Sequence, residues 1–225
     1  TVVLLKGDKD SSIVLMNRSK YVSKFEAMLN EGIHKGIYKE ATDNTLQDLK
    51  RFQDFLYRNL KSYEFYSKMR PKSYQPARLY GTCKTQKFED LENITEDNLK
   101  FRPIIDQTGT LTYNASQVVS NYLRPLCFNE FTIKDTQSFP KQLQTITPLA
   151  PDEEDVSYDV DSLFTNIPVY DTIEYILDQI YVNKKLNPIC SRLIFKRLLV
   201  KLSTDCKFTF NDKFYKQIEG CTMDG

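Results

Sequence analysis

The chain has 225 residues, of which 40% are hydrophobic and 12% aromatic, so it can bury one large core or two small ones and is not a disordered polymer. Its formal net charge of +1 excludes a polycation, so any affinity for nucleic acid has to come from local patches of charge. The five cysteines form no Cys-x-x-Cys pair and His34 is the only histidine, which excludes a readable zinc site and disfavours a serine or cysteine triad.

The odd number of cysteines also bears on the setting of the protein. Together with the absence of a signal peptide or a long apolar run, it predicts a reducing, intracellular and soluble environment with no membrane contact.

The first 60 residues predict a hairpin followed by two helices. Residues 1–5 and 13–16 are rich in β-forming side chains, and residues 6–12 supply the turn formers between them. Residues 19–31 and 44–60 carry apolar side chains at helical spacing. Gly32 is the expected stop of the first helix, and His34 is expected in an exposed turn after it.

The stretch from Lys50 to Lys87 is strongly basic. It holds ten Lys or Arg residues against Asp54 and Glu64, and tyrosines are interleaved with them. Bases stack on such rings while cations contact phosphates. The stretch therefore indicates either a nucleic-acid surface or a solvated helix face above core aromatics, and composition alone does not choose between the two.

Beyond Pro71 and Pro76, which end any helix, two strands are expected at residues 77–82 and 101–106. Lys84 follows the first strand and Arg102 lies in the second. This pattern predicts a two-stranded β-ribbon whose two cations bind one anion. Helices are expected at residues 113–126 and 136–145.

Residues 157–168, SYDVDSLFTNIP, contain the candidate catalytic group. Acidic residues precede this stretch and a helix follows it, so residues 156–160 are expected to form a short strand with Asp159 at its end. Right-hand polymerases need such a carboxylate, because two divalent metals about 3.5–4 Å apart are bridged by an Asp. Taken alone, an Asp in a Tyr-Asp-Val-Asp run is more often a turn or cap residue than a catalytic one.

The last part of the chain predicts two helices and a hairpin. Asp171 and Glu174 have the spacing of a capping box at the start of a helix, and residues 191–202 predict another helix. Residues 207–210 and 213–218 are separated by Asn211 and Asp212, which predicts a closing hairpin.

In this order and spacing the motifs resemble the reverse transcriptase domain, most of all that of Penelope-like retroelements, which are relatives of telomerase reverse transcriptase. Residues 78–84, RLYGTCK, are similar to the family's first fingers motif, and residues 101–105, FRPII, to its second. An upstream element is similar to residues 6–16. The aspartate strand that ends in FTNIP and the glutamine-glycine pattern of residues 217–223 follow, so the resemblance spans nearly the whole chain.

The resemblance implies a metal site and a nucleotide site. Asp159 would be the catalytic, metal-binding aspartate, and the backbone carbonyl of Val160 would be a second oxygen ligand for Mg2+ or Mn2+. Lys84 and Arg102 would hold the nucleotide triphosphate. Phe164, five residues after Asp159, would be the sugar gate against a 2′-hydroxyl.

The remaining matching residues would contact the template and the nucleotide; they are Arg78, Gln217 and Gly220. The implied partners are an RNA template, a DNA primer and deoxynucleoside triphosphates, and the implied location is the nucleus.

Three residues depart from the family's pattern. Asp10 stands where Gly is usual, Gln86 where His is common, and Asp224 follows Met223 where Gly is usual. The chain also ends at Gly225, before the Asp-Asp hairpin that supplies further metal ligands in these enzymes. We therefore expect the chain as given to bind nucleic acid without polymerising.

The expected fold class is α/β, or α+β, with a twisted and mostly antiparallel sheet, packed helices, and the fingers and partial palm of a right-hand polymerase. Residues 1–70 would form an N-terminal hairpin with helices, and residues 71–225 the fingers and the first part of the palm. The expected function is RNA-directed DNA synthesis. The alternatives are a non-catalytic nucleic-acid-binding remnant or domesticated module and, if the alignment of Lys84, Arg102 and Asp159 is chance, a helical structural protein.

Overall fold

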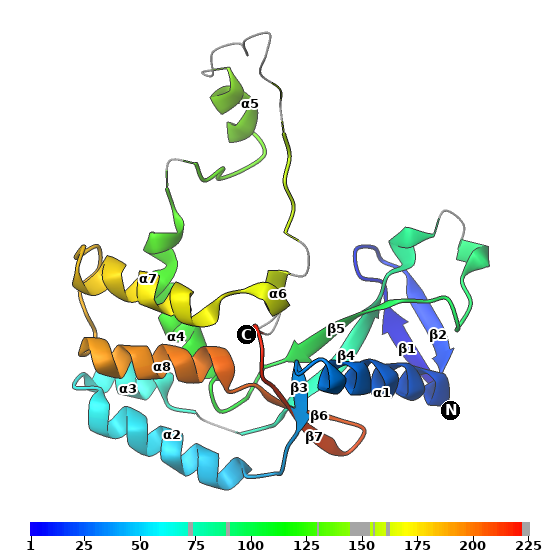
Figure 1. Ribbon diagram of the computed structural model, residues 1–225, viewed down its shortest axis with the longest axis horizontal. Coiled ribbons are helices and arrows are strands. Elements are labelled where there is room, and N and C mark those ends of the chain that lie inside the picture. Colours follow the sequence, from blue (N-terminus) through cyan, green and yellow to red (C-terminus); the bar gives the residue numbers. More distant parts are fainter. Residues whose placement is uncertain are drawn as a thin grey trace.

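The computed structural model describes residues 1–71, 74–88, 91–129, 131–144, 154, 156–160 and 163–221, which form a mixed α/β fold (Figure 1). The strands are β1 (Val2–Lys6), β2 (Ile13–Asn17), β3 (Tyr38–Glu40), β4 (Ala77–Cys83), β5 (Phe101–Asp106), β6 (Lys207–Phe210) and β7 (Lys213–Gln217). The α-helices are α1 (Arg18–His34), α2 (Thr45–Asn59), α3 (Tyr63–Met69), α4 (Tyr113–Leu123), α5 (Ser138–Leu143), α6 (Leu163–Asn166), α7 (Val169–Tyr181) and α8 (Arg192–Thr204). Short 3-10 helices are η1 (Thr85–Lys87), η2 (Leu91–Asn93) and η3 (Arg124–Cys127).

The described strands make a two-stranded sheet, β1-β2, and a five-stranded sheet in the order β3-β7-β6-β4-β5. In the larger sheet β4 and β6 pair in parallel, and the other three pairings are antiparallel. The predictions of a mostly antiparallel sheet, of the N-terminal hairpin and of the β4–β5 ribbon are confirmed. Asn211 and Asp212 have φ of 47° and 61°, which is the left-handed pair that a two-residue hairpin turn requires between β6 and β7.

Helix α1 packs on one face of the sheet. Its Phe25 and Leu29 are buried with Leu79, Phe208 and other sheet residues in one hydrophobic core. Gly81 of β4 makes this contact possible, because a Cβ at that position would lie 2.3 Å from Cζ of Phe25. Any larger residue at position 81 would therefore clash with the ring of Phe25.

The expected end of α1 at Gly32 is wrong. Gly32 lies inside the helix, and a Cβ there would lie 2.4 Å from the Tyr38 ring, so this glycine allows β3 to approach α1. The helix ends at His34, and Gly36 follows with φ of 76°. A glycine in the left-handed region just beyond the last turn is a common helix stop.

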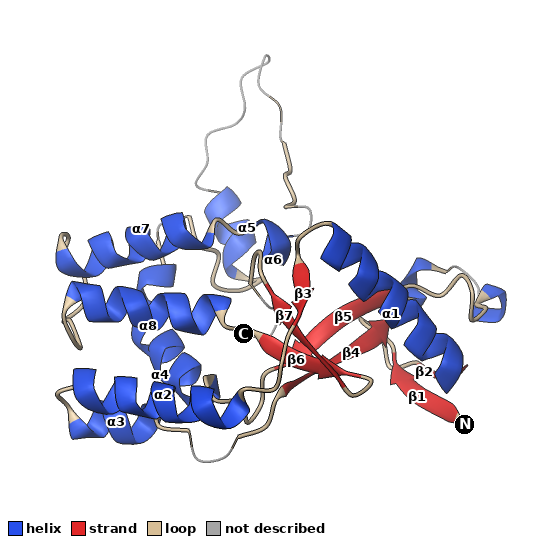
Figure 2. Cartoon of the chain, turned by 60° about the horizontal axis from the view of Figure 1, so that its bottom comes forward, coloured by secondary structure: helices blue, strands red, loops and turns tan. Residues whose placement is uncertain are grey.

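A second hydrophobic core joins α2, α3, α4, α7 and α8, which gather beside the sheet (Figure 2). Its fully buried side chains include Phe52, Leu56, Leu177, Phe195 and Leu198. The two cores do not follow the predicted domain boundary at residue 70, because α1 and β4 share one core while α2 and α4 share the other. The division at residue 70 stays a prediction.

Two local predictions in the second half are wrong. Residues 156–160 form no strand, and Val156, Tyr158 and Val160 are 59%, 91% and 61% exposed. An extended segment becomes a strand only by pairing, and none of the described strands pairs with this one. The predicted capping box is also wrong, because α7 already begins at Val169 and Asp171 lies inside its first turn.

None of the described helices combines the length and the apolar character that a bilayer crossing requires.

Candidate functional site

The β4–β5 ribbon presents one polar face. Ala77, Leu79, Gly81 and Cys83 are the buried positions of β4, so the side chains of the residues between them point to the other side. On that side the pairing sets Arg78 opposite Asp106, Tyr80 opposite Ile104, and Thr82 opposite Arg102. We call this set of six residues the ribbon face.

Lys84 and Arg102 lie at the same end of this ribbon. The backbone N–H of Lys84 donates to the carbonyl of Lys100 at 2.9 Å, which extends the β4–β5 pairing by one step beyond the strand. Lys84 is thus a diagonal neighbour of Arg102, at a separation of roughly 7–8 Å between backbones. Lysine and arginine side chains are long enough to span this separation, so the two residues are candidates for binding one anion.

Arg102 also has a partner within the chain. Its Nη2 lies 3.1 Å from Oδ2 of Asp8, whose side chain is only 5% exposed while that of Arg102 is 32% exposed. The same carboxylate accepts hydrogen bonds from Thr82 Oγ1 at 3.1 Å and from Gln86 Nε2 at 3.3 Å. Sequence reasoning did not single out Asp8, because an Asp in a hairpin turn is an ordinary turn former.

Arg78 occupies the opposite end of the ribbon face. It lies four residues before Thr82, which is about 13 Å along a strand. Its side chain is 70% exposed, and Nη2 is 3.8 Å from Oδ2 of Asp106. Hydrogen bonds from Thr108 are the main reason why the pKa of Asp106 is lowered, and the charge of Arg78 adds to them. Arg78 is therefore accessible to a ligand. It is too far from Arg102 for both residues to bind the same phosphate.

The basic stretch from Lys50 to Lys87 is split by the fold. Lys50 and Arg51 lie exposed on α2, and Tyr57 and Tyr63 are 72% and 82% exposed at the surface of the helical core. Arg78, Lys84 and Arg102 instead lie on or directly after β4 and β5, which are apart from α2 and α3 (Figure 1). The cations and rings on α2 and α3 therefore form a separate surface, which supports neither the nucleic-acid interpretation nor the solvated-face interpretation over the other.

Asp159 and Val160 are exposed. Oδ1 of Asp159 accepts a hydrogen bond from the backbone N–H of Val160 at 3.0 Å, which is a contact within the segment itself. In the described part of the chain, no three His, Cys, Asp or Glu side chains form a group that could hold a metal ion. One carboxylate with one carbonyl fits a Mg2+ ion that also binds substrate phosphates, but these two oxygens alone do not fit two metals.

Phe164, Gln217 and Gly220 are brought to one place. The backbone N–H of Cys221 donates to the carbonyl of Phe164 at 2.7 Å, which joins α6 to the segment after β7. Gln217 is 6% exposed, and its Nε2 donates to the carbonyl of Glu219 at 2.8 Å. Gly220 has φ of 70°, a conformation that favours glycine. Gln217 thus supports the turn that carries Gly220, and its contact with a template stays a prediction.

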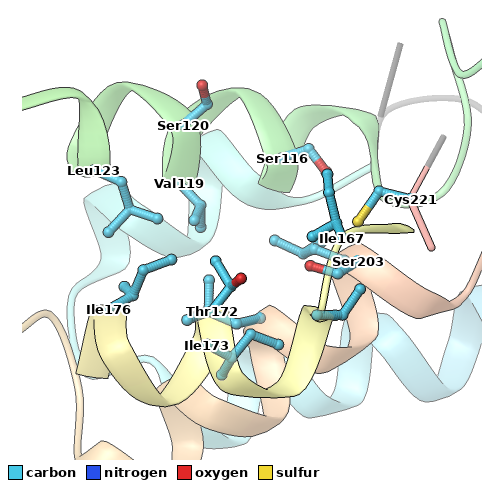
Figure 3. Close-up of a pocket in the computed structure, with 13 residues that line it drawn as sticks. Ser116, Val119, Ser120, Leu123, Ile167, Thr172, Ile173, Ile176, Ser203 and Cys221 are labelled. Carbon is cyan, nitrogen blue, oxygen red and sulfur yellow. The ribbon is translucent and has the colours of Figure 1, made fainter. Parts of the chain in front are cut away.

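A cavity of about 250 Å³ lies between α4, α7 and α8, beside this junction. Figure 3 shows Val119, Leu123, Ile173 and Ile176 around it, with Cys221 at one end. Burial raises the pKa of the Cys221 thiol. None of the described residues that line the cavity is charged, so this part of the lining is unsuited to a triphosphate.

Comparisons of the chain with protein-family models, with curated proteins and with solved structures found no match. Any assignment of function therefore depends on the residues and on their geometry.

Proposed function

We propose that the chain is the fingers and part of the palm of an RNA-directed DNA polymerase, which adds deoxynucleotides to a primer on an RNA template. The observation that carries the proposal is the placement of Lys84 and Arg102 as diagonal neighbours at one end of the β4–β5 ribbon. Their spacing suits a triphosphate, since guanidinium binds phosphate oxygens as a fork and ammonium binds them as a point charge.

The proposed roles follow from the chemistry of in-line nucleotidyl transfer, which is mostly positioning and charge stabilisation. Arg102 and Lys84 bind the phosphates that become the leaving group. Asp159 and the Val160 carbonyl offer oxygen ligands to the Mg2+ of the nucleotide, which when bound offsets phosphate charge. Arg78 and Gly220 contact the nucleic acid near the nucleotide. The template, the primer and a nuclear location remain part of the proposal.

A sugar gate distinguishes a DNA polymerase from a general binder of nucleotides. Phe164 is half-buried, and its backbone is fixed by the hydrogen bond from Cys221. Replacing Phe164 with Ala should raise the affinity for ribonucleoside triphosphates and leave that for deoxynucleoside triphosphates unchanged. The preference for the deoxy sugar should fall by roughly tenfold, which corresponds to about 1.4 kcal/mol. The measurement is the ratio of the two dissociation constants, with Mg2+ present, before and after substitution.

Phe131→Ala is the matched control, because Phe131 is 83% exposed and lies outside the proposed site. It should leave the ratio unchanged. If Phe164→Ala lowers the melting temperature but keeps the ratio, Phe164 is a packing residue and not a sugar gate.

A second candidate function is nucleic-acid binding without catalysis. It is favoured by the exposed, unpaired segment around Asp159, which supplies a single described carboxylate. Such a module would keep the cations of the ribbon and would not select nucleotides by the template base.

A further inference from the structure

The turn between β1 and β2 is fastened to the β4–β5 ribbon by several hydrogen bonds. The backbone N–H of Asp8 donates to the carbonyl of Cys83 at 2.8 Å, and Gly7 forms a parallel bridge with Cys83. Thr85, which is 1% exposed, donates to Oδ2 of Asp10 at 2.7 Å and accepts from Ser12 Oγ at 3.2 Å. The turn is thus a fixed part of the ribbon.

Within this turn the two carboxylates have different partners. Asp8 accepts hydrogen bonds from Thr82 and Gln86 and forms an ion pair with Arg102; all three partners belong to the ribbon or to η1 after it. Asp10 is bonded to Ser12 and Thr85 instead, and these hydrogen bonds lower its pKa. Asp8 alone of the two touches a cation that the proposed function uses.

The buried position of Asp8 decides what it does to Arg102. The Asp8 side chain is 5% exposed, it accepts hydrogen bonds from Thr82 and Gln86, and its Oδ2 forms an ion pair with Nη2 of Arg102, so the carboxylate is held in place beside the guanidinium. The contact goes through Nη2, and a guanidinium carries five N–H donors in a rigid fork, so donors remain for a ligand on the exposed side. Asp8 therefore fixes the side chain of Arg102 and leaves some of its N–H donors free to bind a ligand.

We propose that Asp8 is a positioning residue for nucleotide binding, which holds Arg102 at the ribbon face in the orientation that receives a phosphate. The inference depends on the proposed function for the role of Arg102. An unrestrained Arg loses side-chain entropy when a ligand fixes it. Because Asp8 already fixes Arg102 in the free protein, less of this cost is left to nucleotide binding.

The test is the substitution Asp8→Asn, with the dissociation constant of Mg2+–dTTP as the readout. Asn keeps the size of the side chain but carries no negative charge. Either its NH2 group faces Arg102 and cannot accept a hydrogen bond, or its oxygen faces Arg102 and is uncharged. We expect the dissociation constant for dTTP to rise by roughly tenfold, a factor that corresponds to about 1.4 kcal/mol. Asp10→Asn is the matched control, because it weakens the same turn without touching Arg102, and it should change the dissociation constant less than twofold.

A double-mutant cycle separates positioning from a general structural effect. In an Arg102→Ala background, Asp8→Asn should cause no further loss of dTTP affinity, since the group that it positions is gone. An equal loss in both backgrounds, or tighter binding in Asp8→Asn alone, would overturn the inference. If Arg102→Ala by itself leaves the affinity for dTTP unchanged, Arg102 does not bind the nucleotide, and the proposed function is wrong about this residue.

A second measurement needs no variant of Asp8 that folds. In the nucleotide-free wild-type chain, the Nε–Hε group of Arg102 should have an NMR order parameter near 0.85, as in rigid backbone, whereas that of the exposed Arg197 should be below about 0.6. An order parameter for Arg102 as low as that for Arg197 would contradict positioning by Asp8.

Discussion

Replacing Arg102 with Ala should weaken the binding of Mg2+–dTTP by roughly 10- to 150-fold, since a hydrogen bond to a charged group contributes about 1.5–3 kcal/mol. Arg102 lies at the end of the ribbon that also carries Lys84, and its side chain is partly exposed there. Isothermal titration of the purified chain measures the effect. Arg102→Lys should restore part of the affinity, because charge returns without the fork.

Arg197→Ala is the control for this prediction. Arg197 is exposed on α8, outside the proposed site, and its loss should leave the dissociation constant unchanged. An equal effect of both substitutions would mean that dTTP responds to net charge and has no specific site at the ribbon. Arg102→Ala should also lower the melting temperature, because the buried carboxylate of Asp8 then loses its cation.

Asp205→Asn should destabilise the fold by about 2 kcal/mol at pH 7, below the 3–5 kcal/mol of a fully buried pair. Asp205 is 13% exposed and pairs with Lys201 and with Lys216, the latter at 3.2 Å. Lys216 lies directly opposite Lys207 in the β6–β7 pairing, and Asp48 pairs with Lys207. Because opposed like charges destabilise a sheet, the two carboxylates offset this repulsion where α2 and α8 meet the strands.

The destabilisation should depend on pH. Burial raises the pKa of Asp205, but hydrogen bonds and the charges of Lys201 and Lys216 outweigh this effect, so its pKa in the folded state lies below the ordinary value of 3.8. The stabilisation is therefore fully present above pH 3.8 and is lost as the pH falls through the lower pKa of the folded state. Urea unfolding should show a constant difference between wild type and variant at neutral pH and a shrinking one below about pH 4.

Glu31→Gln is the matched control for this pH series. Its ion pair with Lys35 is 62–66% exposed, and an exposed pair contributes about 0–1 kcal/mol. A difference between Asp205→Asn and wild type that stays the same down to pH 2.5 would show that packing, and not the charge of Asp205, is what the substitution removes.

The elements that sequence predicts well are those whose signal is local. Asn211 and Asp212 favour the left-handed turn between β6 and β7 in themselves, and the apolar spacing of α2 and α8 follows a helical period. Residues 156–160 show the opposite case. Their alternation is compatible with a strand, but pairing is a long-range property, and no described strand supplies it.

The candidate site shows the same division. Local pattern predicts that Lys84 follows one strand of the ribbon and that Arg102 lies in the other. The register between the two strands could not be read from the sequence. Asp8 was missed because its partners Thr82, Gln86 and Arg102 lie 74, 78 and 94 positions further along the chain. The capping box at Asp171 fails because Glu174 pairs with Arg192 and Lys196 of α8 instead of with the start of its own helix.

A polymerase of the proposed kind selects each nucleotide by the template base. The most direct test of this selection uses an RNA template with a primer that ends in a dideoxynucleotide, so that no bond can form. The four deoxynucleoside triphosphates are added one at a time with Mg2+, and the dissociation rate of the chain from the primed template is measured. Only the complementary nucleotide should slow dissociation, by about tenfold, and Arg102→Ala should abolish the effect. Equal dissociation rates with all four nucleotides would contradict the proposed function and would leave nucleic-acid binding without template-directed selection.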